Sequence, residues 1–464
     1  MKGGSGHGLL LATIAVSMFL DGLDGTIVNI ALPEIADSFG IGTGDVSWVT
    51  TVYFLVMAGL ILVFGRICDK GAIKKVLICG TAVFTMGSFC CGISPSFPLL
   101  LLSRAVQGVG AAMLASSAVM LGVKFLPRGK VGLSMTLVVL GSSIGIALGP
   151  TVGALITELF SWHWIFFINV PIGLLAILMA HRAVPRDGGF EEGGLDVVGS
   201  ALLFAAIVCG LFVVERAPSG GFTPVCATAL VLCVLLFAAF YLYDRGRESP
   251  ALDLGLFQNR DFDEVTLAYV FVNVAIMGVV YLLPFLLKVV FGMDTLESGL
   301  ILSLQAVPMI LCCLFVNRLA ARHGNTLLAV LSCLMLLAFV PIGLCFDADS
   351  PLWLLVAGIL VAGSVWGLGG GPMSTRMVDS LEDRDKGSGS SMVTFVMYFG
   401  SALGTALAAG LFGLGSGEGS GSISDVSPEA FMDGFACCLA MVAVLAVAAV
   451  ALSLSAKADR RDGA

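Results

Sequence analysis

Three charged side chains lie inside long apolar runs of this sequence, where they are the residues best suited to carry chemistry. Asp21 and Asp24 are three residues apart, on one face of a helix, and Arg104 lies near one end of another run. A charge in an apolar span is costly and is a functional candidate by default. Burial and a neighbouring cation act on a carboxylate in opposite directions, so two acids beside one evident base favour a group that exchanges a proton. The alternative is a permanent structural Asp–Arg ion pair.

The other residue types that commonly do chemistry predict neither an enzyme nor a metal site. None of the thirteen cysteines shows the paired spacing of a zinc site, and no HExxH or GxxxxGK[ST] string occurs. No histidine neighbours another: they are His7, His163, His181 and His323. We therefore expect no catalytic residues, no metal and no cofactor, with a proton gradient as the energy source, and cysteines that serve as small apolar fillers.

The composition is that of an integral membrane protein. Of 464 residues, 58% are hydrophobic and 12% are charged, with a mean hydropathy of +1.01. Soluble proteins carry about 25% charged residues, so a water-soluble enzyme of this length is excluded. The net charge of −8 is spread along the chain, and no basic stripe with interleaved aromatic residues predicts a nucleic-acid partner.

Fourteen apolar segments are each long enough to cross a bilayer as a helix. Helices are required because lipid offers no hydrogen-bond partner to backbone groups. The segments are 9–31, 46–66, 75–94, 98–123, 131–157, 163–181, 195–215, 224–243, 264–290, 297–318, 327–346, 351–378, 388–412 and 431–455. The sequence therefore predicts an all-α membrane fold with fourteen spans.

The basic residues predict how these spans are oriented. One side of the chain collects 21 of the 24 Lys and Arg residues, which places both termini in the cytoplasm and the protein in the cytoplasmic membrane. The opposite side receives only Arg216 and Lys288. Lys288 has two readings: it snorkels to the outer interface, or it puts positive charge at the mouth of a cavity and disfavours cationic substrates.

An internal repeat predicts the architecture. The loop after the second segment runs from Gly65 to Lys75. A degraded copy of its sequence, which includes Arg318 and Arg322, follows the tenth segment. This displacement of eight spans fits two six-span halves with two extra central spans between them. The predicted domains are a bundle over 9–181, the inserted spans over 195–243 and a second bundle over 264–455. Repeats of this kind build many secondary transporters, which bind substrate near the midplane.

The first copy of this loop resembles the signature of the major facilitator superfamily. Gly65, Asp69, Lys70 and Lys74 fit that pattern, whereas Ala72 and Ile73 depart from it. The resemblance implies a cytoplasmic gate that also includes Arg318 and Arg322. In such a gate Gly65 would let two helices approach closely, and Asp69 would contact a helix N-terminus or a basic side chain. The alternative is a basic loop that only sets topology.

The fifth segment carries four glycines at a strict spacing of four residues. Gly141, Gly145, Gly149 and Gly153 form one smooth ridge along a helix, interrupted by Pro150. Small-residue packing between membrane helices is one explanation of the ridge. The full string resembles the antiporter motif of facilitators that export their substrates, and this resemblance implies export.

Longer strings resemble the fourteen-span drug:proton antiporter family within that superfamily. They lie in the first span from Leu23 to Pro33, in the fourth from Arg104 to Ala111, in the sixth from Trp162 to Gly173, and in the stretch from Pro250 to Phe257. His163 stands where the family usually has arginine, and Lys288 where it commonly has glutamine. The resemblance implies that Asn29 and Gln107, within these strings, line the substrate cavity.

We therefore expect a proton-coupled exporter of amphipathic or drug-like molecules that works as a monomer in the bilayer. Asp24 is the leading coupling residue because it lies within the matched string, whereas Asp21 lies outside it. A dedicated exporter of one metabolite or lipid-like molecule is the alternative, since apolar cavity residues do not distinguish the two. A channel is disfavoured because no filter sequence or ring of charges is visible.

Overall fold

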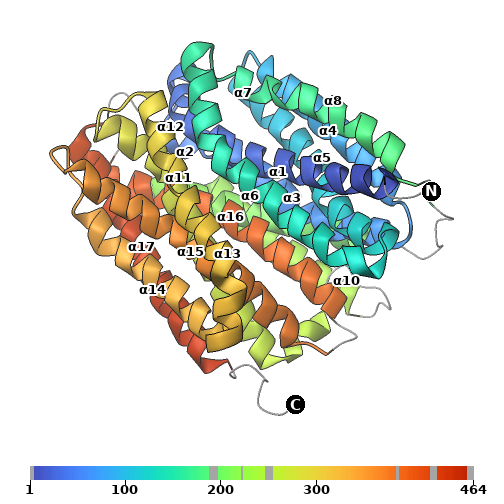
Figure 1. The fold of residues 1–464 in the computed structure, drawn as a ribbon. Helices are drawn as coiled ribbons and strands as arrows, with labels where there is room; N and C mark the ends of the chain where they lie inside the picture. The colour runs from blue at the N-terminus through green and yellow to red at the C-terminus, as the bar shows by residue number, and fades with distance from the viewer. Residues whose placement is uncertain are drawn as a thin grey trace. The chain divides into compact units, whose positions relative to one another are not determined.

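The computed structural model describes residues 5–185, 187, 197–220, 223–245, 254–382, 386–417 and 426–456. In these ranges all regular secondary structure is helical (Figure 1). The helices are α1 (Ser5–Phe39), α2 (Thr43–Val46), α3 (Trp48–Asp69), α4 (Ile73–Gly92), α5 (Phe97–Phe125), α6 (Arg128–Leu159), α7 (Trp164–Phe167), α8 (Asn169–Ala183), α9 (Val197–Gly220), α10 (Pro224–Asp244), η1 (Leu254–Gln258), α11 (Arg260–Val289), α12 (Thr295–Ser303), α13 (Ala306–His323), α14 (Asn325–Leu344), α15 (Leu352–Asp379), α16 (Lys386–Ser416) and α17 (Pro428–Ser455).

The helices confirm the expected class of all-α membrane protein. Among the described residues, thirteen helical stretches are long and apolar enough to cross a membrane, and α9 adds a shorter apolar run, Val198–Val214. Each of the fourteen predicted segments overlaps one of these stretches. Of the string from Pro250 to Phe257, the first four residues lie outside the described ranges and the rest belong to η1. Several basic residues counted for the orientation also lie outside the described ranges: Lys2, Arg186, Arg247, Arg384, Lys457, Arg460 and Arg461.

Contacts divide the chain into two compact units. The first comprises Met1–Ala31, Val52–Ile207 and Val234–Leu252. Within it, α4 packs along α5 and α8 (Figure 1). Glycines bring α4 and α5 together, because a Cβ added at Gly110 would lie 2.3 Å from the Phe84 nitrogen and one at Gly87 would lie 2.7 Å from the Gln107 nitrogen.

The second unit comprises Leu32–Thr51, Val208–Cys233 and Asp253–Ala464. Its centre is α11, which packs against α16 and α17, while α14 packs against α15 and α17. Of an apolar 18-residue stretch of α11, 83% is buried, whereas only 11% of the corresponding stretch of α10 is buried. In a membrane protein this contrast separates a helix surrounded by protein from one whose apolar side chains face lipid.

Helix α1 contributes to both units. The helix belongs to the first unit up to Ala31 and to the second unit from Leu32. Pro33, inside the helix, directly follows this boundary. Proline has no backbone N–H to donate to the carbonyl of Asn29 four residues earlier. The helix therefore bends more easily at this point.

Candidate coupling and gating site

Buried polar side chains from four helices of the first unit converge on Asp24. Asp24 Oδ2 accepts a hydrogen bond from Arg104 Nη1 at 2.8 Å, and Asp24 Oδ1 accepts from Gln107 Nε2 at 2.7 Å and from Asn169 Nδ2 at 2.9 Å. Arg104 Nη1 also donates to Gln107 Oε1 at 2.7 Å, and Gln107 Nε2 donates to Ser88 Oγ at 2.6 Å. We call these five residues the coupling cluster.

The coupling cluster is closed off from solvent. Arg104 is 1% exposed and the other four residues are fully buried. The Arg104 guanidinium carbon also lies 4.1 Å from the centre of the Tyr53 ring and 5.8 Å from that of Phe166, within reach of cation–π attraction. Because arginine does not deprotonate in proteins, the cluster holds one fixed positive charge. A proton on Asp24 therefore changes the local net charge from zero to +1.

Some of the residues singled out in the sequence meet in this cluster and others do not. Asp24, Arg104 and Gln107 are in direct contact. Asn29 is buried on α1 but is not among the hydrogen-bond partners described for Asp24, and Asp21 is half-buried. The roles of these residues stay predictions.

Sequence reasoning missed Ser88 and Asn169 as members of the cluster. Both are neutral, and neutral polar residues are common in membrane helices, so neither stands out as a buried charge does. Asn169 had one usable signal, its place inside the matched string of the sixth span. Its Oδ1 atom is buried and has no hydrogen-bond partner among the described residues, while its Nδ2 donates to Asp24.

The glycine ridge of α6 packs against α1, the helix that carries Asp24. A Cβ at Gly141 would lie 2.5 Å from the Ala15 carbonyl oxygen, and one at Gly145 would lie 2.5 Å from Leu23 N. The contact continues at Gly149 and Gly153, which face Thr26 and Ile27. Pro150 lies inside α6, which runs on to Leu159. The ridge thus brings two backbones together on either side of Asp24.

The gate residues predicted from the superfamily signature lie at the end of α3, in the loop after it and at the start of α4. Asp69 is exposed, and its backbone carbonyl accepts from Lys124 Nζ at 3.3 Å. Gly71 has φ +102°, a left-handed conformation that glycine adopts without strain. The close helix contact expected at Gly65 is not found, since a Cβ there would meet no described atom within 4 Å. Gly65 is half-exposed on the last turns of α3 rather than at a helix crossing.

Asp69→Asn is expected to lower the transport rate while leaving substrate affinity within about threefold, a change of less than 1 kcal/mol. The reason is that a gate residue contacts its partner in only one access state and does not touch the substrate. Transport rates in vesicles and affinities in detergent measure the two effects. Equal losses of rate and affinity would show that this loop is not a gate.

Lys74 and Asp187 tie the ends of α4 and α8 together. Asp187 accepts from the Lys74 and Lys75 backbone N–H groups at 2.8 and 3.0 Å, which caps the first turn of α4. In return, Lys74 Nζ donates to the carbonyls of His181 and Val184, at 2.9 and 2.6 Å, at the end of α8. Each helix thereby satisfies groups that the other leaves unpaired.

Asp187→Ala is expected to lower the free energy of unfolding by about 1–2 kcal/mol, because it uncaps two N–H groups of α4. Lys75→Ala is the matched control, since only the backbone of Lys75 contacts Asp187 and its side chain is exposed. Its effect should stay within about 0.5 kcal/mol. Equilibrium unfolding in mixed micelles measures both. Equal stability of the two variants would mean that the cap contributes nothing.

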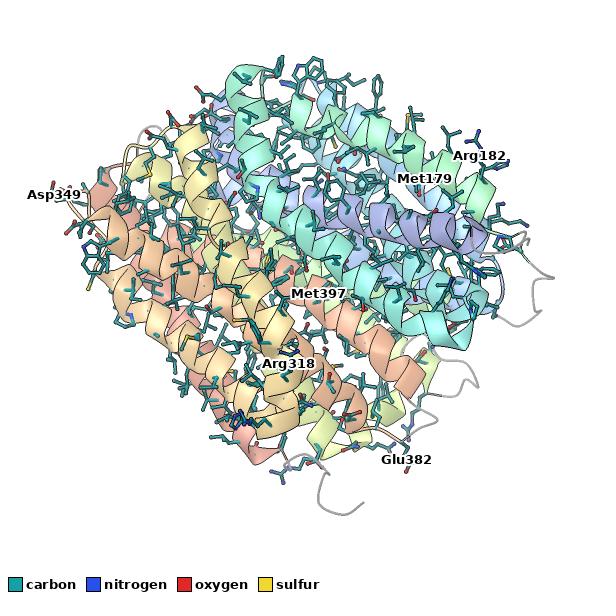
Figure 2. The ribbon with its side chains drawn as sticks, in the orientation of Figure 1. Met179, Arg182, Arg318, Asp349, Glu382 and Met397 are labelled. Carbon is teal, nitrogen blue, oxygen red and sulfur yellow. The ribbon has the colours of Figure 1, made fainter. Side chains whose placement is uncertain are left out.

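The second copy of the loop is arranged differently. Arg318, labelled in Figure 2, and Arg322 are exposed in the last turns of α13. Neither is in an ion pair with a described residue. Ala321 stands where the first copy of the repeat has Asp69, so the second copy has no acidic residue at this position. Their part in a gate stays a prediction.

Lys288 pairs with two acids near the end of α1. Its Nζ lies 2.6 Å from Glu34 Oε1 and 2.8 Å from Asp37 Oδ2, and Thr295 Oγ1 donates to Glu34 at 3.3 Å. The three groups together carry a formal net charge of −1, and both readings of Lys288 stay predictions. The sequence could not supply these partners, which lie about 250 residues away.

His163 stands where the resembling family usually has arginine, and it lies directly before α7. Its ring stacks on Trp162 with centroids 3.6 Å apart. Burial lowers the pKa of His163 from its ordinary value of 6.5, because the charged imidazolium is poorly solvated there. The substitution therefore removes a positive charge from the connection before α7.

Comparison with known proteins links this arrangement to one family of transporters. The family model described as Major Facilitator Superfamily matches residues 14–405. The riboflavin transporter RibZ of Clostridioides difficile is 30% identical over 406 residues, which cover 87% of this chain and 88% of RibZ. The putative multidrug resistance protein MdtD of Escherichia coli O6:H1 is 29% identical over 407 residues, which cover 86% of this chain and 85% of MdtD.

Solved structures share the fold at low sequence identity. A bacterial homolog of the human lysosomal transporter Spinster superposes with a TM-score of 0.68 at 14% identity, over 97% of this chain and 98% of that one. The nucleoside transporter NupG superposes with a TM-score of 0.67 at 13% identity, over 96% and 98%. With the family model and the two relatives, this shared fold means that the chain belongs to the major facilitator superfamily and is a membrane transporter, not an enzyme.

Proposed function

We propose that this transporter exports amphipathic or drug-like small molecules in exchange for protons. The observation that carries the proposal is the buried ion pair between Asp24 and Arg104 inside the coupling cluster. A buried pair contributes little net stability compared with apolar residues of similar volume, so stability alone does not account for it. A carboxylate in a membrane span is by contrast the usual element of a proton relay.

The proton acts through the charge of the cluster. Protonation of Asp24 removes the counter-charge of Arg104 and leaves a net charge of +1 among apolar side chains. Asn169 Oδ1, buried beside Asp24 without a partner, is the acceptor for the new O–H once the amide rotates. The two protonation states therefore favour different arrangements of α1, and a substrate that prefers one arrangement is coupled to the proton.

Inverted membrane vesicles that contain the protein test this proposal. Ethidium, a lipophilic cation, and riboflavin, a neutral metabolite, serve as fluorescent probes. An imposed proton gradient should drive uptake of at least one probe, and an uncoupler should abolish it. Uptake that persists at the same rate with the uncoupler would contradict proton coupling.

A second candidate is the export of one metabolite. It is favoured by the 30% identity to a riboflavin transporter over most of both chains. The two candidates differ in breadth, so the same vesicles distinguish them. Riboflavin uptake that unlabelled riboflavin inhibits and ethidium does not would identify a dedicated transporter, whereas mutual inhibition would identify a broad one.

We further propose that the protein lies in the bacterial cytoplasmic membrane, as a functional monomer with both termini in the cytoplasm. The bacterial relatives support the membrane, and the excess of Lys and Arg on one side supports the orientation. Protease digestion of an epitope at either end, in intact cells and in inverted vesicles, tests the orientation.

A further inference from the structure

Two elements of the second unit hold the end of α1 and the segment that follows it. Lys288 of α11 pairs with Glu34 and Asp37, which lie three residues apart on one face of α1. Two turns earlier on α11, the buried Tyr281 hydroxyl donates to the Thr43 carbonyl. Helix α11 thus contacts this part of the chain at two points.

The first turn of α12 completes the arrangement. Asp294 caps α12 by accepting from Glu297 N at 2.7 Å, which fixes the turn that carries Thr295. Thr295 donates to Glu34, the carboxylate that Lys288 also contacts. The other charged groups nearby are the exposed Asp294 and Glu297 of α12, and Asp45 of α2, which pairs with Arg216 at 2.9 Å.

Helix α1 has different partners on the two sides of Pro33. Before the proline it carries Asp24, which belongs to the coupling cluster of the first unit. After the proline it carries Glu34 and Asp37, which are held within the second unit. A weak point between two anchored stretches lets α1 bend at Pro33, so a change at one anchor changes the angle between the two stretches.

We propose that Glu34, Asp37 and Lys288 form a latch that joins α1 to α11 in one access state and opens in the other. Transporters built from two repeats switch access by moving one repeat against the other. The predicted first bundle, 9–181, includes Glu34 and Asp37, and the predicted second bundle, 264–455, includes Lys288. Contacts group these three residues in the second unit of this structure, and a movement of one predicted bundle against the other would break the latch. Lys288 is then a positioning residue that acts on Asp24 through α1. This inference rests on the proposed proton-coupled transport.

Charge reversal tests the latch in the vesicle assay with ethidium and riboflavin. Lys288→Glu places three carboxylates together and is expected to slow uptake about tenfold or more, since like charges in contact are strongly unfavourable. Adding Glu34→Lys restores an opposite pair and should return the rate to within about threefold of the wild type. Arg260→Glu is the matched control on the same helix: it breaks an exposed pair with Glu264 and should leave the rate within about twofold.

A cysteine pair provides a second test that does not need reversed charges. In Glu34→Cys with Lys288→Cys, a reducible bifunctional thiol reagent that spans the length of the Glu–Lys pair should cross-link the two cysteines. Mass spectrometry identifies the cross-link because native cysteines are present. The cross-link should abolish uptake, and reduction should restore it. If the charge-reversed protein does not fold, this pair decides the question.

Different results contradict the two proposals. A wild-type protein without gradient-driven uptake contradicts the proposed function. If the wild type transports, the latch is overturned by equal rates for Lys288→Glu and the wild type, by a double variant as slow as the single one, or by cross-linked protein that still transports.

Discussion

Asp24→Asn is expected to reduce proton-driven uptake to the level of vesicles without the protein, while substrate affinity stays within about threefold. Asparagine resembles the protonated carboxyl group in shape and charge, so the coupling cluster keeps a permanent net charge of +1. Its side-chain oxygen still accepts a hydrogen bond from Arg104, which limits the loss of stability. The transporter is then held among the arrangements that protonation favours.

Asp21→Asn is the matched control for this variant, because it makes the same change three residues earlier on the same helix. Its effect on uptake should be milder. The assay compares uptake and its pH dependence with substrate binding to purified protein. An Asp24→Asn protein that transports at the wild-type rate with the same pH dependence would refute the assignment, and Asp21 would become the leading candidate.

Gly145→Ala is expected to lower the free energy of unfolding by about 1–3 kcal/mol and to slow transport. The added Cβ would lie 2.5 Å from Leu23 N and from the Phe19 carbonyl oxygen, and these backbone atoms cannot turn aside as a side chain can. Helix α1 must therefore shift, and Asp24 must shift with it because it directly follows Leu23. Loss of stability and loss of coupling should therefore appear together.

Gly370→Ala makes the same change in α15, where a Cβ would meet no described atom within 4 Å and the next residue is not a proline. Alanine has the higher helix propensity, so this control should be neutral or more stable by up to about 1 kcal/mol. Equilibrium unfolding in mixed micelles and uptake in vesicles measure both variants. Equal stability of Gly145→Ala and Gly370→Ala would mean that the α1–α6 contact tolerates a wider spacing.

The helices could be predicted from sequence because the bilayer leaves few choices. A run of about 20 apolar residues must be a helix in lipid, so the fourteen segments follow from hydropathy alone. Asp24 and Arg104 could be selected for a related reason, since a charge in an apolar span needs a partner. Ser88 and Asn169 could not, because neutral polar residues carry no such requirement.

Contacts between segments that are distant along the chain could not be predicted from the sequence. The spacing of Gly141 to Gly153 shows one smooth helix face but does not identify α1 as its partner. Lys288 is visible as a lone cation, yet its pairing with Glu34 depends on how α1 ends. Gly65 fits a signature and still has open space around it, because a motif records a residue type and not the state of its surroundings.

The burial of the Asp24–Arg104 pair also constrains how this transporter can evolve. Replacement of either residue by one that makes no hydrogen bond to the other leaves a charge unpaired in the protein interior. The cost is about 3–5 kcal/mol, a large part of the roughly 5–15 kcal/mol by which folded proteins are stable. Under the proposed proton coupling, an ancestor or descendant that uses no proton must therefore change both positions together, or first acquire mutations that raise stability. Natural selection would meet a fitness valley between coupled and uncoupled transport, and lineages on either side would seldom cross it.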